Sequence, residues 1–130
     1  MKTYIYAYLI LSCAAVYAQE KSRLDQVIAR REALLVQIYE AVQSGAKTGT
    51  NDPTQVRTAA LELYAFRRDT AKTLPERIRW QEQIVELENA EAKNVKGRAA
   101  VGVMLPLDVT RAEERALAAE QKLLELQQSK

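Results

Sequence analysis

Glycine and proline, the residues that most often end a helix, occur in only three parts of this chain. These are a turn-rich stretch from Gly45 to Pro53, the single Pro75, and a stretch from Gly97 to Pro106. Proline withholds a backbone donor and glycine is costly inside a helix, so the runs between these breaks predict helices. We expect an all-α fold with helices at about residues 22–44, 53–73, 75–101 and 107–128. We expect them to form antiparallel, coiled-coil-like helical hairpins after an N-terminal signal peptide.

The first residues are typical of a secretory signal peptide. Lys2 supplies a positive charge, residues 4–16 form an apolar core, and the sequence Val-Tyr-Ala at residues 16–18 suits signal peptidase. We therefore expect cleavage after residue 18, which leaves residues 19–130 as a helical-hairpin domain. The protein would then be secreted across the inner membrane and would lie in the periplasm.

Two alternatives remain for this segment. A transmembrane anchor would need about 20 apolar residues, and the apolar core is shorter than that. The sequence Ile-Leu-Ser before Cys13 could also direct lipid attachment to that cysteine, although the residues after it stay apolar where a polar tether would be expected.

The composition of the exported chain excludes several kinds of chemistry. Cys13 is the only cysteine and leaves with the signal peptide, and the chain has no histidine. Disulfides, cysteine–histidine nucleophiles and the commonest metal ligand are therefore absent. The net charge of +2 falls to about +1 without Lys2, and its charges are interspersed, so nucleic acid is not an expected partner. We expect no catalytic, cofactor-binding or metal site, and we assign the acidic groups Glu82, Glu86, Glu88, Glu91, Glu113 and Glu114 to solvated helix faces.

Each segment carries apolar residues at helical spacing. In the first segment these are Leu24, Ile28, Leu35, Ile38 and Val42, with Arg31 in the one gap, and in the second they are Val56, Ala60, Leu63 and Phe66. The third segment has two stripes, one of Ile78, Val85, Ala92 and Val95 and one of Trp80, Ile84 and Leu87, so it should contact two neighbours. The fourth has an unbroken heptad seam of Val109, Ala112, Ala116, Ala119, Leu123 and Leu126.

Capping residues mark several helix starts. Ser22 is a candidate N-cap for the first helix, and Asp52 followed by Pro53 is a candidate for the second. Thr73 and Glu76 have capping-box spacing around Pro75, which favours a break there over a kink. After residue 18, no acidic residue is followed four positions later by a basic one, so packing must hold these helices. Because the core is thin for a monomer, we expect a homo-oligomer or a protein partner.

The third break is unusually apolar. Gly102 suits a helix end with positive φ, Pro106 prevents simple helical continuation, and Asp108 can accept hydrogen bonds from free donors of the last helix. The residues around the reversal, Val103, Met104, Leu105 and Leu107, are all apolar. They could fold back over the helix ends as a small cap, or they could form a docking tip for another protein.

This stretch resembles the periplasmic hairpin tip of the outer-membrane efflux channel family, the TolC-like proteins. The matching residues are Arg98, Val101, Gly102, Asp108, Val109, Ala112, Ala119, Glu120 and Leu123. The resemblance implies that Val101, Gly102 and the tip residues after them touch a partner, and that Arg98, Pro106 and Asp108 shape the turn. Pro106 and Thr110 depart from the family's pattern, and the chain has no alternating strand segments for a barrel, so it would be a reduced relative.

We therefore expect an exported, non-enzymatic protein that acts by helix–helix association and docks an envelope partner. The alternative is a self-assembling structural coiled-coil protein with no transport role. Binding to a membrane surface, which would rest on the amphipathic helices, is disfavoured, because their polar faces mix acidic and basic residues and leave anionic lipid little to hold.

Overall fold

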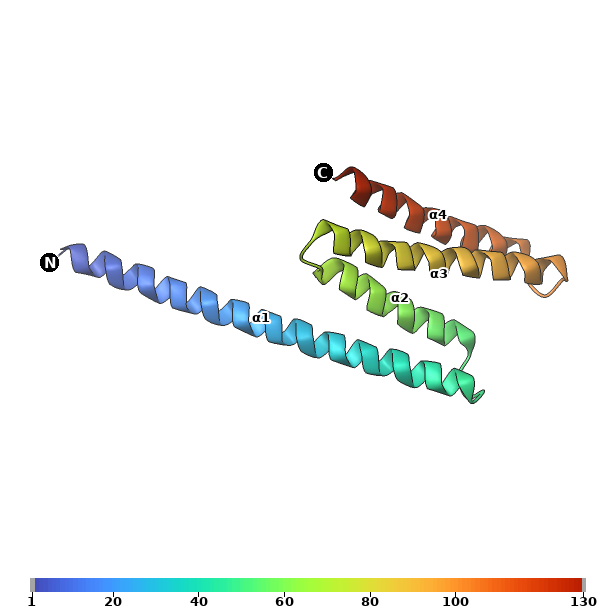
Figure 1. Ribbon diagram of the computed structural model, residues 1–130, viewed down its shortest axis with the longest axis horizontal. Coiled ribbons are helices and arrows are strands. Elements are labelled where there is room, and N and C mark those ends of the chain that lie inside the picture. The colour runs from blue at the N-terminus through green and yellow to red at the C-terminus, as the bar shows by residue number, and fades with distance from the viewer. Residues whose placement is uncertain (1, 130) are drawn as a thin grey trace. The chain divides into compact units, whose positions relative to one another are not determined.

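The structure is a computed structural model that describes the backbone of residues 2–129 and the side chains of residues 19–129. It consists of four helices: α1 (Lys2–Lys47), α2 (Pro53–Thr70), α3 (Leu74–Ala100) and α4 (Pro106–Gln128). Figure 1 shows them in order along the chain. No strand occurs between residues 2 and 129, so the predicted all-α fold class is confirmed.

Local capping explains where α2 and α3 begin. The Thr54 N–H donates to the Asp52 carboxylate over 2.7 Å, with Pro53 in the first helical turn. At α3 the Glu76 N–H donates to the Thr73 hydroxyl over 3.4 Å, and the Thr73 N–H donates back to the Glu76 carboxylate over 3.3 Å. This capping box separates α3 from α2, so Pro75 lies at a helix start and does not kink a continuous helix.

The first helix differs from the expectation at both ends. Ser22 lies inside α1 and does not cap it, because no glycine or proline precedes Gly45 to interrupt the helix. At the other end α1 continues past Gly45 to Lys47, and Gly49 takes the left-handed conformation with φ of 76°. The Thr50 N–H then donates to the Gly45 carbonyl over 2.8 Å, which completes a Schellman motif. The predicted signal peptide, residues 1–18, lies outside the described side chains and stays a prediction.

The chain divides into two compact units, Met1–Leu34 and Leu35–Lys130. Within the described part of the first unit, the apolar side chains of Leu24, Val27 and Leu34 are half exposed or more.

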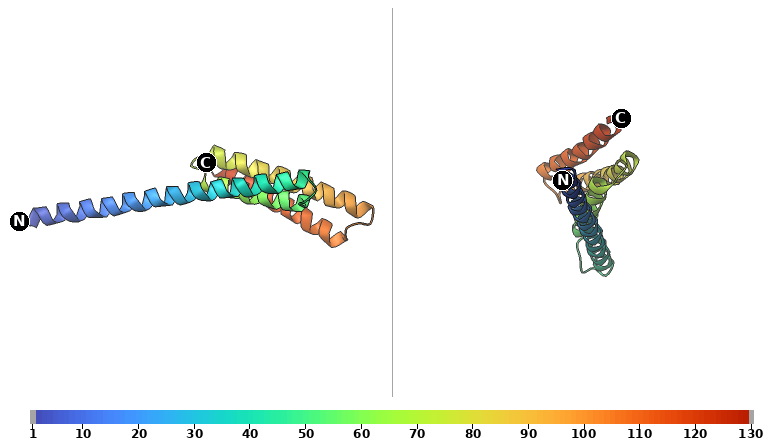
Figure 2. Two further views of the ribbon diagram at one scale, coloured as in Figure 1. Left: turned by 90° about the horizontal axis from the view of Figure 1, so that it is seen from below. Right: turned by 90° about the vertical axis from the view of Figure 1, so that its left-hand side faces the viewer.

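In the second unit, α3 packs against both α2 and α4, as the views in Figures 1 and 2 show. The buried apolar residues of this unit are Ala59, Ala60, Leu63 and Phe66 of α2, Ile84 and Val95 of α3, and Ala112, Ala116 and Ala119 of α4. The seam predicted for α4 is therefore confirmed, with Val109, Leu123 and Leu126 half-buried at its two ends. Small side chains in this seam allow α4 to approach α3 closely.

Between α2 and α3, aromatic and cationic side chains stack. The rings of Tyr64 and Trp80 lie 5.5 Å apart at 32°, and the Arg67 guanidinium carbon lies 4.8 Å from the centre of the Trp80 ring. Burial raises the pKa of the Tyr64 hydroxyl, and the neighbouring Tyr39 raises it further. Trp80 thus belongs to the α2–α3 contact.

A polar layer crosses the second unit where an apolar one was expected. Gln81 is 1% exposed and Glu88 is 7% exposed, and with Ile84 and Val95 they form the buried face of α3. The predicted stripe residues Ile78, Val85 and Ala92 are only half-buried. Val95 from one predicted stripe and Ile84 from the other are buried, and Gln81 and Glu88, which the prediction did not include, complete a partly polar seam.

The buried polar groups of α3 bond to both neighbouring helices. The Gln81 amide donates to the Ala119 carbonyl of α4 over 2.8 Å and accepts from Arg68 of α2 over 2.8 Å. Arg57 Nη1 of α2 donates to the two carboxylate oxygens of Glu88, over 3.2 and 3.1 Å. Arg115 Nε of α4 lies 3.6 Å from Glu88, an ion pair too long for a hydrogen bond.

Candidate interaction site

The end of α3 is a complete Schellman motif. Gly102 has a φ of 76°, as its position predicted. Its N–H donates to the Ala99 carbonyl over 3.0 Å, and the Val103 N–H donates to the Arg98 carbonyl over 2.9 Å. Arg98 contributes to the turn through its backbone carbonyl, which accepts this hydrogen bond.

Asp108 lies in the first turn of α4. The helix begins at Pro106, with Leu105 as the N-cap residue and Asp108 as its third residue. The Asp108 carboxylate accepts from the Leu105 N–H over 3.2 Å, which is one half of a capping box. Pro106 takes the first helical position because its fixed φ suits that place and its missing donor is not needed there.

The apolar residues of the reversal are mostly exposed to solvent. We call residues 101–107 the tip. Val101 is 74% exposed, Leu105 is 68%, Val103 is 60% and Leu107 is 55%, whereas Met104 is half-buried. The interpretation in which these side chains fold back over the helix ends is therefore wrong for all but Met104. The tip presents apolar surface outward.

Cationic side chains lie on the helices just behind the tip. Lys93, Lys96 and Arg98 of α3 and Arg111 of α4 are all exposed. Lys96 Nζ lies 3.9 Å from the Glu113 carboxylate, a weak surface pair. The pKa of Asp52 is lowered, chiefly by its hydrogen bonds from Thr54 and to a lesser extent by the charge of Arg98.

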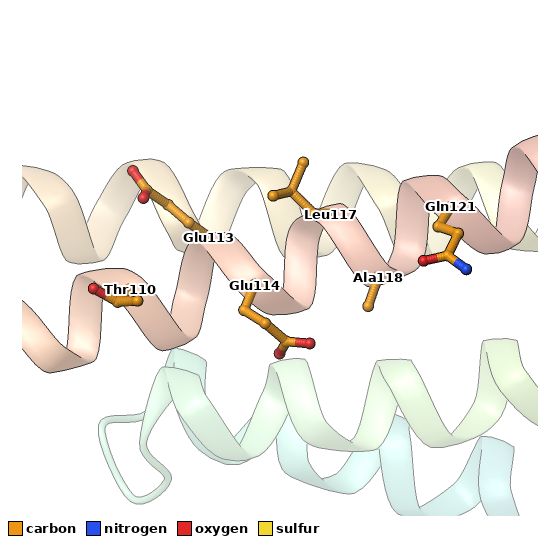
Figure 3. A pocket seen from close by; sticks show the side chains of 6 residues that line it. All are labelled: Thr110, Glu113, Glu114, Leu117, Ala118 and Gln121. Atoms are coloured by element: carbon orange, nitrogen blue, oxygen red, sulfur yellow. The ribbon is translucent and has the colours of Figure 1, made fainter.

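The outward side of α4 carries a shallow depression of about 340 Å³, shown in Figure 3. It is lined by Thr110, Glu113, Glu114, Leu117, Ala118 and Gln121. Figure 3 shows that the carboxylates of Glu113 and Glu114 point to opposite sides of the helix. They do not face each other as a catalytic pair of carboxylates would.

Sequence reasoning missed the most buried polar groups, Gln81 and Glu88. Glu88 was assigned to a solvated face together with its acidic neighbours on α3. A usable signal was present, because Gln81, Ile84, Glu88 and Val95 follow heptad spacing of three, four and seven. Arg57 and Arg115 supply matching charges from the two helices that flank α3.

No group of three or more histidine, cysteine, aspartate or glutamate side chains in the part of the chain that the structure describes could hold a metal ion. None of the helices within the described residues combines the length and the hydropathy needed to cross a membrane. In comparisons with known proteins, no family model, no curated protein and no solved structure matches this chain.

Proposed function

We propose that this protein is an exported, non-enzymatic helical protein that acts by contact, with the tip as its contact surface. The observation that carries the proposal is the exposure of four apolar side chains on a turn whose backbone is fixed by internal hydrogen bonds. Soluble monomers seldom expose grouped apolar side chains without a partner for them. The proposed partner-binding residues are Val101, Gly102, Val103, Met104, Leu105 and Leu107.

The framework of this proposal is a set of antiparallel, coiled-coil-like hairpins. In support, Lys96 of α3 approaches Glu113 of α4 near the turn, and Gln81 reaches Ala119 farther from it. Residue numbers that fall on one helix while they rise on the other are typical of antiparallel neighbours. The alanines of α4 on the buried side fit the close spacing of such a pair.

Export rests on the signal-peptide pattern of residues 1–18, with lipid attachment at Cys13 as the alternative. After cleavage the protein would lie in the periplasm and associate with the cell envelope. The resemblance of the tip to TolC-like channel proteins supports a reduced relative that docks an envelope partner. Pro106 departs from the family's pattern, but it occupies a helical position where proline is tolerated, so it does not weigh against the proposal.

A second candidate function is self-assembly into a structural coiled coil. Leu117 and Leu124 on the outward side of α4 are 64% and 49% exposed, and they lie seven residues apart. That spacing would let another helix pack along α4. Under this alternative the tip is dispensable and the outward side of α4 is not.

The two candidates differ in which leucines matter. The test compares Leu105→Ser/Leu107→Ser in the tip with Leu117→Ser on α4, which serves as a matched exposed leucine. Envelope association is measured by fractionation of intact cells, and the oligomeric state by size-exclusion chromatography with light scattering. The proposal predicts that only the tip variant loses envelope association and that its oligomeric state is unchanged. If the tip variant associates as the unmodified protein does, the docking function is wrong.

A further inference from the structure

We propose that the envelope partner of the tip is a membrane surface: the tip enters the headgroup region of an anionic bilayer end-on, and the cations behind it contact the lipid phosphates. This inference deepens the proposed function and rests on it, because it names the partner of the same tip. It differs from binding along a helix face, which the mixed charges of those faces disfavour.

The tip and the residues just before it are uniformly apolar. Nine successive residues, 99–107, carry no polar side chain. Four of them are more than half exposed, and they lie at the reversal that joins α3 to α4. Apolar side chains at such a position can leave water for the acyl boundary without moving the helices behind them.

Several backbone donors of the tip are already bonded within the turn. The N–H groups of Gly102 and Val103 bond to α3 carbonyls, and that of Leu105 bonds to the Asp108 carboxylate. Pro106 has no N–H to satisfy. A free backbone donor is costly to bring into an apolar medium, so a turn with internal bonds enters the interface at low cost.

Charged side chains behind the tip are mostly basic. Between residues 92 and 112 the chain has four cations, Lys93, Lys96, Arg98 and Arg111, and one acid, Asp108, and the next acids are Glu91, Glu113 and Glu114. All four cations are exposed, Lys96 with only a weak surface pair to Glu113, whereas Asp108 is half-buried and bonded to the turn. Apolar residues at the end followed by cations match the order of acyl chain and phosphate in an anionic leaflet.

These features favour lipid over a protein socket. Protein interfaces carry about one hydrogen bond for each 100–200 Å² of buried area, and they use those bonds for orientation. Residues 99–107 offer no polar side chain for such a bond. Binding to an anionic bilayer requires only apolar surface and positive charge at the correct distance behind it.

The experiment uses the full chain with an environment-sensitive fluorophore at Met104→Cys in a Cys13→Ser background. A position-specific probe is needed because the apolar residues 4–16 can bind vesicles by themselves. The vesicles are pure phosphatidylcholine, or phosphatidylcholine with about one third phosphatidylglycerol. We expect a blue-shifted emission at position 104 with the anionic vesicles, and an unchanged emission from a matched probe at Leu117→Cys on α4.

Two variants separate the apolar and the electrostatic contributions to vesicle binding. Leu105→Ser/Leu107→Ser should raise the lipid concentration for half-maximal shift by about a hundredfold, because both exposed leucines lose their transfer energy. Lys96→Gln/Arg98→Gln should raise it by roughly thirtyfold, since each cation near an anionic surface contributes about fivefold. Salt should remove the second effect and leave the first. Circular dichroism checks that each variant keeps its helix content.

An emission at position 104 that stays at its aqueous value with anionic vesicles overturns the inference. An equal shift with neutral vesicles also overturns it, because the cations would then play no part. If vesicles leave the probe in water while envelope association still needs Leu105 and Leu107, the partner is a protein socket; the inference fails and the proposed function stands. If neither vesicle binding nor envelope association depends on Leu105 and Leu107, the inference and the proposed function both fail.

Discussion

Glu88 is the group whose replacement should destabilise the fold most. Its side chain is 8% exposed and pairs with Arg57 of α2, whose side chain is 19% exposed, and with Arg115 of α4, which is 41% exposed. Removing one partner of a buried ion pair costs about 3–5 kcal/mol, because the remaining charge stays buried and unpaired. Both arginine side chains remain partly exposed, although their Nε atoms are buried, so we take the lower end. Glu88→Ala should lower the free energy of unfolding by about 3 kcal/mol.

The assay is urea unfolding of the full chain, followed by circular dichroism, with Glu82→Ala as the matched control. Glu82 is exposed on the same helix, so its replacement should change stability by less than about 0.5 kcal/mol. Glu88→Gln should fall between the two, because the amide oxygen can still accept from Arg57. If Glu88→Ala matches Glu82→Ala within error, the polar layer does not stabilise the packing of α2, α3 and α4, and the reasoning is refuted.

Three further changes test other parts of the fold by the same urea assay. Gly102→Ala should destabilise the chain by roughly 1–2 kcal/mol, because φ at this residue is 76°. Gly97→Ala lies inside α3, where the added methyl group meets no atom within 4 Å, and should stabilise the chain by roughly 0.5–1 kcal/mol. Equal effects of the two substitutions would contradict the Schellman turn. Ala112→Leu should cost about 1–3 kcal/mol, since Ala112 is fully buried against α3; a neutral result would mean that α4 packs loosely. The raised pKa of Tyr64 means that the folded state holds this proton more tightly, so its contribution to stability is present below about pH 10 and is lost as the pH rises above it. Tyr64→Phe should remove that part of the alkaline loss, and an unchanged pH profile would show that another group causes it.

The helix breaks could be predicted because their causes are local. Asp52, Thr73 with Glu76, and Gly102 each act on backbone groups within a few residues of themselves. The predicted start of α4, at about residue 107, lies one residue after the observed start at Pro106. The exact end of a helix depends on local backbone geometry, so a difference of one or two residues is usual.

The polar residues of the α3 seam could not be predicted from the apolar pattern, which gave only Ile84 and Val95. Gln81 and Glu88 are buried because α2 and α4 supply partners for them, and those partners are 13 to 38 residues away in sequence. The exposure of the tip was open for a related reason. An apolar turn has the same sequence whether its side chains fold back or face water, and the two cases differ only in the folded structure.

We propose that this protein acts by contact through its tip. The most direct measurement places a photoreactive residue at Met104 in intact cells and compares its adducts with those formed from Leu117, an exposed position on α4. We predict that an envelope component, lipid or protein, is crosslinked from position 104 and not from position 117. We also predict that Leu105→Ser/Leu107→Ser abolishes that adduct. Identical adducts from both positions, or an adduct that survives the double substitution, would contradict the account.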